Sequence, residues 1–268
     1  MHEVTLPGGV LVDGERRRDA ALRPVAGADE ALLLESDALA PVERSTLLLG
    51  RCVVRLGPLE SPGDAAVRGL AAGDREALLL HLRRLTLGER IDLVLSCPAC
   101  DEALDLELPT RALLVPSYDE WAPEHELEME GARVRFRLPN GGDLEAAARV
   151  AVVDPERAAR TVFERCVLAP TDGLSPEAVA ALSQRMAELD PQAELALEMP
   201  CPECGHRFTV VLDAGDLLAR ELAGRSDVLL REIHLLASHY GWSESELLAM
   251  TSRRRRRYVA YLAEAIGR

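Results

Sequence analysis

The tetrapeptide Cys97-Pro98-Ala99-Cys100 recurs later in the chain as Cys201-Pro202-Glu203-Cys204. In each copy two thiols lie on one tight turn, close enough to supply two corners of a tetrahedron around a metal ion. The residues around both turns alternate between apolar and polar, as at 104–108 and 194–198, which predicts β-strands. We therefore expect each pair of cysteines to lie at the tip of a β-hairpin.

Two such turns together supply the four ligands of one Zn²⁺ site, which are Cys97, Cys100, Cys201 and Cys204. Four thiolates leave no coordination position for water, so the ion would be structural and not catalytic. The turns are about 100 residues apart, which is longer than the usual spacing in a zinc ribbon. Two alternatives therefore stay open: degenerate turns that bind no metal, and a redox-active CxxC pair.

Two further landmarks occur in the same order in both halves of the chain. Arg51-Cys52-Val53 matches Arg165-Cys166-Val167, and Leu6-Pro7-Gly8-Gly9 matches Leu138-Pro139-Asn140-Gly141-Gly142. Because ordered self-similarity is the signature of repeated units, the sequence predicts an internal duplication. The alternative is a single domain with two cysteine turns whose flanking sequences are similar by chance. Cys52 and Cys166 lie in apolar helical contexts, so we expect them to be small core residues and not metal ligands.

We predict an α+β fold in which each copy consists of a strand, helices and a hairpin with a CPxC zinc knuckle. The copies cover 1–114 and 131–215, and the acidic, proline-containing segment 115–130 between them is expected to be a linker or an exposed excursion. The region 216–268 has no counterpart in the first copy. Its pattern predicts helices at 216–223, 227–240, 244–250 and 253–266, the third with a capping box formed by Ser243 and Glu246.

The helical C-terminal region carries the residues that we predict to bind a partner protein. Trp242 lies in the turn between two helices, and Tyr258, Tyr261 and Leu262 belong to an apolar stripe at helical spacing. Exposed aromatic side chains are frequent anchors of protein interfaces. The alternative is that Trp242 packs the helical region against itself.

Composition and charge argue against binding to nucleic acid or to a membrane. The 268 residues have a net charge of −14, and only 3% of them are aromatic. The electrostatic field of this negative charge repels a phosphate backbone. The five arginines at 253–257 would point in all directions around a helix and so would not form one surface that faces a nucleic acid. No apolar run reaches the roughly 20 residues that span a bilayer, and the N-terminus lacks the features of a signal peptide. The sequence therefore predicts a cytoplasmic protein without a membrane partner.

No catalytic motif is recognisable in the sequence. The six histidines form no H-E-x-x-H pattern, and neither a P-loop nor a G-x-S-x-G motif is present. Carboxylates are numerous, but no pair stands out as a general acid and base. We therefore expect a protein that is not an enzyme.

These motifs resemble a family of baseplate and tail-assembly proteins from T4-like contractile phages and phage-tail-like contractile injection systems. The resemblance lies in Leu6-Pro7-Gly8-Gly9, in the segment 73–83 and in the two CPxC turns. The segments 230–244 and 254–258 are similar to a short helical module encoded in the same kind of gene cluster.

The resemblance implies a non-enzymatic baseplate or hub component, or an assembly factor with a chaperone role. The implied partners are the tube, spike-hub or tape-measure proteins, and the chain could become part of an assembled tail-like particle. The resemblance leaves the oligomeric state open. The alternative function is a zinc-ribbon adaptor in nucleic-acid metabolism, and a thiol-redox enzyme is a third possibility.

Overall fold

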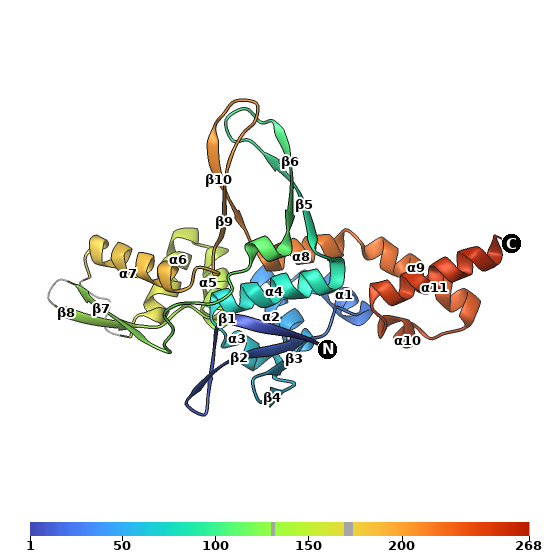
Figure 1. Ribbon diagram of the computed structural model, residues 1–268, viewed down its shortest axis with the longest axis horizontal. Helices are drawn as coiled ribbons and strands as arrows, with labels where there is room; N and C mark the ends of the chain where they lie inside the picture. Colours follow the sequence, from blue (N-terminus) through green and yellow to red (C-terminus); the bar gives the residue numbers. More distant parts are fainter. Residues whose placement is uncertain (130–131, 169–173, 268) are drawn as a thin grey trace.

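The computed structural model describes residues 1–129, 132–168 and 174–267, which form a mixed α+β structure (Figure 1). A four-stranded antiparallel sheet in the order β1-β2-β3-β4 lies in the central body. Its strands are β1 His2–Val12, β2 Glu15–Leu22, β3 Val53–Leu56 and β4 Leu59–Glu60. The helices of this half are α1 Gly27–Leu34, α2 Pro41–Cys52, α3 Gly63–Arg68 and α4 Ala72–Leu87.

The second half of the chain builds a smaller cluster at one end of the molecule (Figure 1). It contains the hairpin of β7 His125–Met129 and β8 Ala132–Phe136, followed by α5 Gly141–Ala151, α6 Pro155–Cys166 and α7 Pro176–Leu189. Phe136, Leu182 and Met186 are buried in its core. The segment 115–130, for which we expected a linker or an exposed excursion, includes β7 and the buried side chain of Tyr118.

Two long β-hairpins project from the same side of the central body and approach each other at their tips (Figure 1). The first pairs β5 Arg90–Ser96 with β6 Ala103–Pro109, and the second pairs β9 Leu195–Pro200 with β10 Arg207–Leu212. The short 3-10 helix η1 Thr110–Leu113 follows the first hairpin. The CPxC turns close both hairpins, which confirms that the cysteines lie at their tips.

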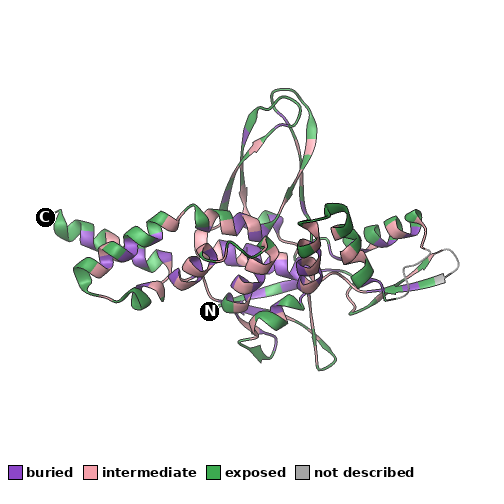
Figure 2. Cartoon of the chain, turned by 180° about the vertical axis from the view of Figure 1, so that it is seen from behind, coloured by how far each residue is buried: buried purple, intermediate pink, exposed green. Residues whose placement is uncertain are grey.

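The C-terminal region is helical, as predicted, and consists of α8 Ala214–Ala223, α9 Ser226–Tyr240, α10 Glu244–Leu248 and α11 Ser252–Ile266. The capping box of Ser243 and Glu246 begins α10. Helix α8 joins the main core, whereas α9, α10 and α11 surround a small core of their own. Figure 2 shows that buried residues concentrate in the central body. Within the described residues, no helix combines the length and the apolar character needed to cross a membrane.

One of the three sequence landmarks does not hold in the structure. Gly8 and Gly9 lie within β1, and their backbone N–H groups donate to the carboxylate of Asp74 at 2.8 Å. Gly141 and Gly142 instead open α5, behind the N-cap residue Asn140. The two Gly-Gly pairs therefore occupy different structural positions, because a glycine pair suits both a strand irregularity and a helix start.

Candidate metal centre

The two cysteine turns have the same backbone geometry. The N–H of Asp101 donates to the carbonyl oxygen of Cys97, and the N–H of Gly205 donates to that of Cys201, both at 2.9 Å. Both donor residues have a left-handed backbone, with φ of 58° at Asp101 and 71° at Gly205. Glycine adopts this conformation without strain and aspartate tolerates it. The sequence difference at this position therefore leaves the turn unchanged.

The tips bring all four predicted ligands together. The Sγ atoms of Cys97 and Cys204 are 3.7 Å apart, and those of Cys100 and Cys201 are also 3.7 Å apart. All four sulfur atoms lie within 4.8 Å of one another, and every cysteine is a free thiol. These separations are far longer than the roughly 2.05 Å of a disulfide bond. The cluster can therefore hold a metal ion between the two hairpins.

The spacing of the sulfur atoms suits a tetrahedral ion. A regular tetrahedron with metal–sulfur distances of about 2.3 Å has sulfur–sulfur edges of about 3.8 Å. The two 3.7 Å separations match those edges. Each hairpin supplies one inner ligand, Cys97 or Cys201, which is buried, and one outer ligand, Cys100 or Cys204, which is exposed.

The turn favours a thiolate at Cys97. Desolvation acts to raise the pKa of its thiol, but the backbone N–H groups of Ala99 and Cys100 and the neighbouring thiols lower it to about 7. A thiolate is the form of cysteine that binds a metal ion. The contacts within the cluster thus lower the pKa of the Cys97 thiol and raise those of the Cys100 and Cys204 thiols.

Apolar side chains cover the inner side of the sulfur cluster. Leu104 is buried beside Cys97 and Cys201, and Leu95 and Phe208 pack against them. The ring of His206 is exposed and stacks on that of Phe208, with 6.4 Å between the ring centroids. His206 is not a member of the four-residue cluster.

Cys52 and Cys166 lie in the two cores, as predicted, and each contacts a buried carboxylate. The Sγ atom of Cys52 is 3.9 Å from Oδ2 of Asp29. Asp29 also accepts hydrogen bonds from Arg23 at 2.5 Å and from Arg51 at 2.7 Å. Burial acts to raise the pKa of Asp29, but these guanidinium groups and the N–H of Ala26 outweigh it and lower the pKa.

The same network recurs in the second half. Asp143 accepts hydrogen bonds from Arg137 at 2.5 Å and from Arg165 at 2.8 Å, and Sγ of Cys166 is 3.8 Å away. Burial raises the pKa of the Cys166 thiol to about 12, as it does that of Cys52. Sequence reasoning noted the two cysteines but missed both aspartates. Each of the four residues in this network lies 114 residues after its counterpart, and this constant spacing was the signal that could have revealed them.

A second group of buried acids joins the two halves near the start of α4. Asp190 accepts hydrogen bonds from the hydroxyl of Tyr118 and from the N–H of Gly73, the latter at 3.0 Å. Burial raises the pKa of Asp190, and it raises that of Asp74 to about 6. Burial also raises the pKa of Glu76 to about 8, helped by the nearby charge of Asp213. Asp74 lies within the first turn of α4.

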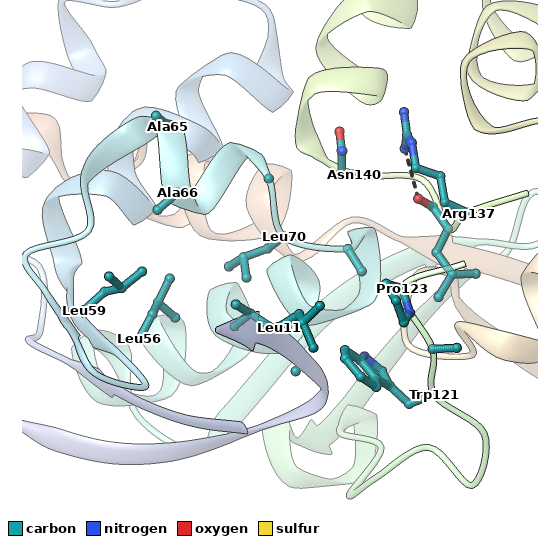
Figure 3. A pocket seen from close by; sticks show the side chains of 16 residues that line it. Leu11, Leu56, Leu59, Ala65, Ala66, Leu70, Trp121, Pro123, Arg137 and Asn140 are labelled. Atoms are coloured by element: carbon teal, nitrogen blue, oxygen red, sulfur yellow. Dashed lines mark hydrogen bonds between the residues drawn. The ribbon is translucent and has the colours of Figure 1, made fainter. Parts of the chain in front are cut away.

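A cavity of about 400 Å³ lies between the β1–β2 hairpin, α3 and the segment around Trp121 (Figure 3). Its lining is largely apolar and includes Leu11, Leu56 and Leu70. The one arginine in the lining, Arg137, already forms the ion pair with Asp143. The arrangement packs apolar groups and offers no acid–base pair for chemistry.

The predicted partner-binding residues lie in α11 and, for Trp242, in the turn between α9 and α10, and they differ in exposure. The ring of Trp242 lies 4.7 Å from that of Tyr240 and 4.8 Å from that of Tyr258, so these aromatic residues pack against one another. Leu262 is buried, and Tyr261 is 53% exposed. Of the four, Tyr261 therefore presents the most open side chain for contact with another molecule.

The arginine run at 253–257 does not form a uniformly solvated surface. Arg255 is completely buried and forms ion pairs of 2.9 Å with both Glu30 and Glu232. Its guanidinium group also donates to the carbonyl oxygen of Met250 at 2.7 Å. Sequence reasoning missed this role, because nothing in a run of five identical residues distinguishes the one that points inward.

The comparisons with known proteins agree with the resemblance noted in the sequence. A family model described as T4 bacteriophage base plate protein matches residues 20–216. The matched range includes both hairpins and all four cysteines of the cluster. The search of curated proteins and the search of solved structures found no match.

Proposed function

The chain belongs to the T4 bacteriophage base plate protein family, and from this premise we propose that it acts as a non-enzymatic baseplate component or assembly factor of a contractile, phage-tail-like particle. The observation that carries the proposal is the match over residues 20–216, which spans both halves of the chain and both hairpins. Its partners are then other baseplate or tail proteins, such as the tube, spike-hub or tape-measure proteins. The chain acts in the cytoplasm, where it joins the particle or assists its assembly.

We propose that the four cysteines bind one structural Zn²⁺. The fit of the 3.7 Å sulfur–sulfur separations to a tetrahedral S₄ shell supports this ion, because four thiolates select zinc or iron–sulfur chemistry. A bound Zn²⁺ contributes folding energy by tying its ligands together. Here the ligands come from two hairpins that are distant in sequence, so the ion holds the two halves in one orientation.

We further propose that the two halves arose by duplication of one strand–helix–hairpin unit. The repeated Arg–Asp–Arg–Cys network and the matching cysteine turns support this origin. A duplicated unit accounts for a shared metal site, because equivalent turns of two related units meet when the units face each other. The resulting body presents a rigid surface on which other tail proteins can assemble.

Quantitative mass spectrometry of purified particles from the native host tests the proposed role. A fixed, simple ratio of this chain to the spike protein identifies a structural baseplate subunit. Absence from the particles, together with failed assembly after deletion of the gene, identifies an assembly factor that leaves. Absence from the particles with normal assembly overturns the proposal.

A further inference from the structure

Helix α8 fills a groove between α2 and α4 in the first half. Leu217, Leu218 and Leu222 of α8 are buried in the main core together with leucines of α2 and α4. The contact with α2 is close, because a Cβ atom on Gly215 would lie only 2.2 Å from Oγ of Ser45. Figure 1 shows α8 beside α4, far from α6 and α7.

Polar contacts hold α8 in this groove at both ends. The N–H of Ala214, at the start of α8, donates to a carboxyl oxygen of Glu76 at 2.9 Å. Near the end of α8, Glu221 forms an ion pair with Arg83 of α4 at 2.6 Å. The α2–α4 groove is therefore a seat for an amphipathic helix, occupied by the chain's own α8.

The second half contains the counterpart of this groove. Helix α6 follows α2 at the constant spacing of 114 residues, so Ala159 stands where Ser45 stands in the first half. Helix α7 follows α4 at a spacing of 104 residues, as Leu182 follows Leu78. Leu78 and Leu182 are both completely buried in their cores. The inner face of each helix pair thus packs into the core of its own half.

No helix among the described residues covers the outer face of the α6–α7 pair. Two cavities of about 430 and 490 Å³ lie along it, and both are lined by Ala159, Phe163 and Ser183. Met186 lines the first cavity and Val179 the second. The three shared residues place the two cavities side by side, and we call the two together the α6–α7 groove. Among the described helices, none occupies the position over α6 and α7 that α8 occupies over α2 and α4.

We propose that the α6–α7 groove binds an amphipathic helix of a partner protein, in the way that α8 fills the α2–α4 groove. Burial of an apolar helix face in a groove is a recurrent mode of recognition. Two observations support a helix as the occupant. A helix, α8, fills the counterpart groove, and Ala159 occupies the position that corresponds to Ser45. The α8 helix of a second copy is not available as the occupant, because it is buried in its own core.

The side chains of the groove define the partner helix further. Gly215 of α8 is followed by leucines two, three and seven residues later, and a small residue followed by apolar residues at these positions fits the second groove in the same way. Ala180 and Ala187 stand in place of Glu76 and Arg83. The partner helix therefore needs no acidic residue that matches Glu221, and its binding rests on apolar contact.

Site-specific photo-crosslinking in the native host tests this proposal on the full chain. A photoreactive residue at position 183 lies in the groove, whereas one at position 181, on the same helix, does not line either cavity. Both positions are exposed, so neither replacement disturbs the core. We expect crosslinks from position 183, and not from 181, to one amphipathic helical segment of a second protein, mapped by mass spectrometry.

A pair of variants measures the affinity for that segment as a synthetic peptide. Ser183→Arg fills the groove and should weaken binding roughly tenfold or more, whereas Ala181→Arg should leave it unchanged. Equal binding by both variants overturns the proposal. Crosslinks from position 183 only to a second copy of this chain, only to nucleic acid, or to nothing in cells that assemble the protein's complex also overturn it. These readouts do not depend on the presence of the chain in finished particles, so they can fail or succeed independently of the proposed baseplate role.

Discussion

Arg255 and Glu30 are 225 residues apart in the chain, yet their side chains form a completely buried ion pair with 2.9 Å between Nη2 and Oε1. The pair fastens α11 to α1, and Glu232 of α9 completes it from the other side. The N–H of Gly27 donates to the carbonyl oxygen of Met250 at 3.0 Å in the same contact. The C-terminal helices are therefore docked on the N-terminal half by a desolvated charge cluster.

Removal of the buried guanidinium should destabilise this contact strongly. Arg255→Met leaves Glu30 and Glu232 buried without their partner, and we expect a loss of about 3–5 kcal/mol in the free energy of unfolding. Denaturant unfolding measures it. The matched control is Arg253→Met in the same run, where the side chain is exposed and the change should stay within about 0.5 kcal/mol. Similar losses in both variants would contradict a specific role for Arg255.

Loss of one cluster cysteine should remove the metal and loosen the two halves. For Cys201→Ser we expect the bound metal to fall from one ion per chain to a small fraction, and the melting temperature to fall by on the order of 10 °C. Elemental analysis and calorimetry measure the two quantities. Cys166→Ala is the control for metal content, because its thiol lies in the core outside the cluster. Unchanged metal content and melting in the Cys201 variant would refute the shared site.

The buried aspartate network predicts a defined sensitivity to acid. The pKa of Asp143 is lowered in the folded protein, so its stabilisation is present above the ordinary value of 3.8 and is lost as the pH falls further. Asp143→Asn should cost about 2–4 kcal/mol at pH 7, and its difference from the wild type should shrink below about pH 4. Urea unfolding at pH 7 and pH 3 measures both. Asp105→Asn, on an exposed strand position, should show neither effect.

The raised pKa of Glu76 predicts that the stability of the protein falls as the pH rises. Burial raises its pKa from 4.5 to about 8, so the folded state retains a proton that the unfolded state has lost, and stability falls as the pH rises towards 8. Glu76→Gln keeps an acceptor for the N–H of Ala214 and removes this titration. We expect a smaller fall in melting temperature between pH 6.5 and 9 than in the wild type. A parallel fall in the variant would exclude Glu76 as the cause, and the exposed Glu264→Gln serves as the control.

The metal site was predictable in its parts, because each CPxC turn is a local feature. Two cysteines separated by two residues and flanked by alternating strands define a hairpin tip from nearby residues alone. The contacts of Cys97 with Cys204 and of Cys100 with Cys201 could not be predicted from nearby residues, because they depend on how the whole chain folds. The exchange of Gly205 for Asp101 did not hide the similarity, since both residues accept a left-handed backbone.

The misplaced landmark and the missed residues have a common cause. Gly8-Gly9 and Gly141-Gly142 look alike in the sequence, but the first pair donates to Asp74 from a strand and the second opens a helix. Local identity says nothing about which long-range partner a backbone N–H will find. The same holds for Tyr118, which lies in an acidic segment without periodicity and is nevertheless buried against Asp190.

By itself the sequence determined the C-terminal helices, the two cysteine hairpins and the pairs of thiols, since periodicity, capping residues and ligand spacing act over a few neighbouring residues. Only the tertiary structure decided which charges are buried and which helix faces are covered. Arg255 lies inside an arginine run, and α8 covers α2 and α4 while no described helix covers α6 and α7, because burial depends on contacts between segments far apart in the chain.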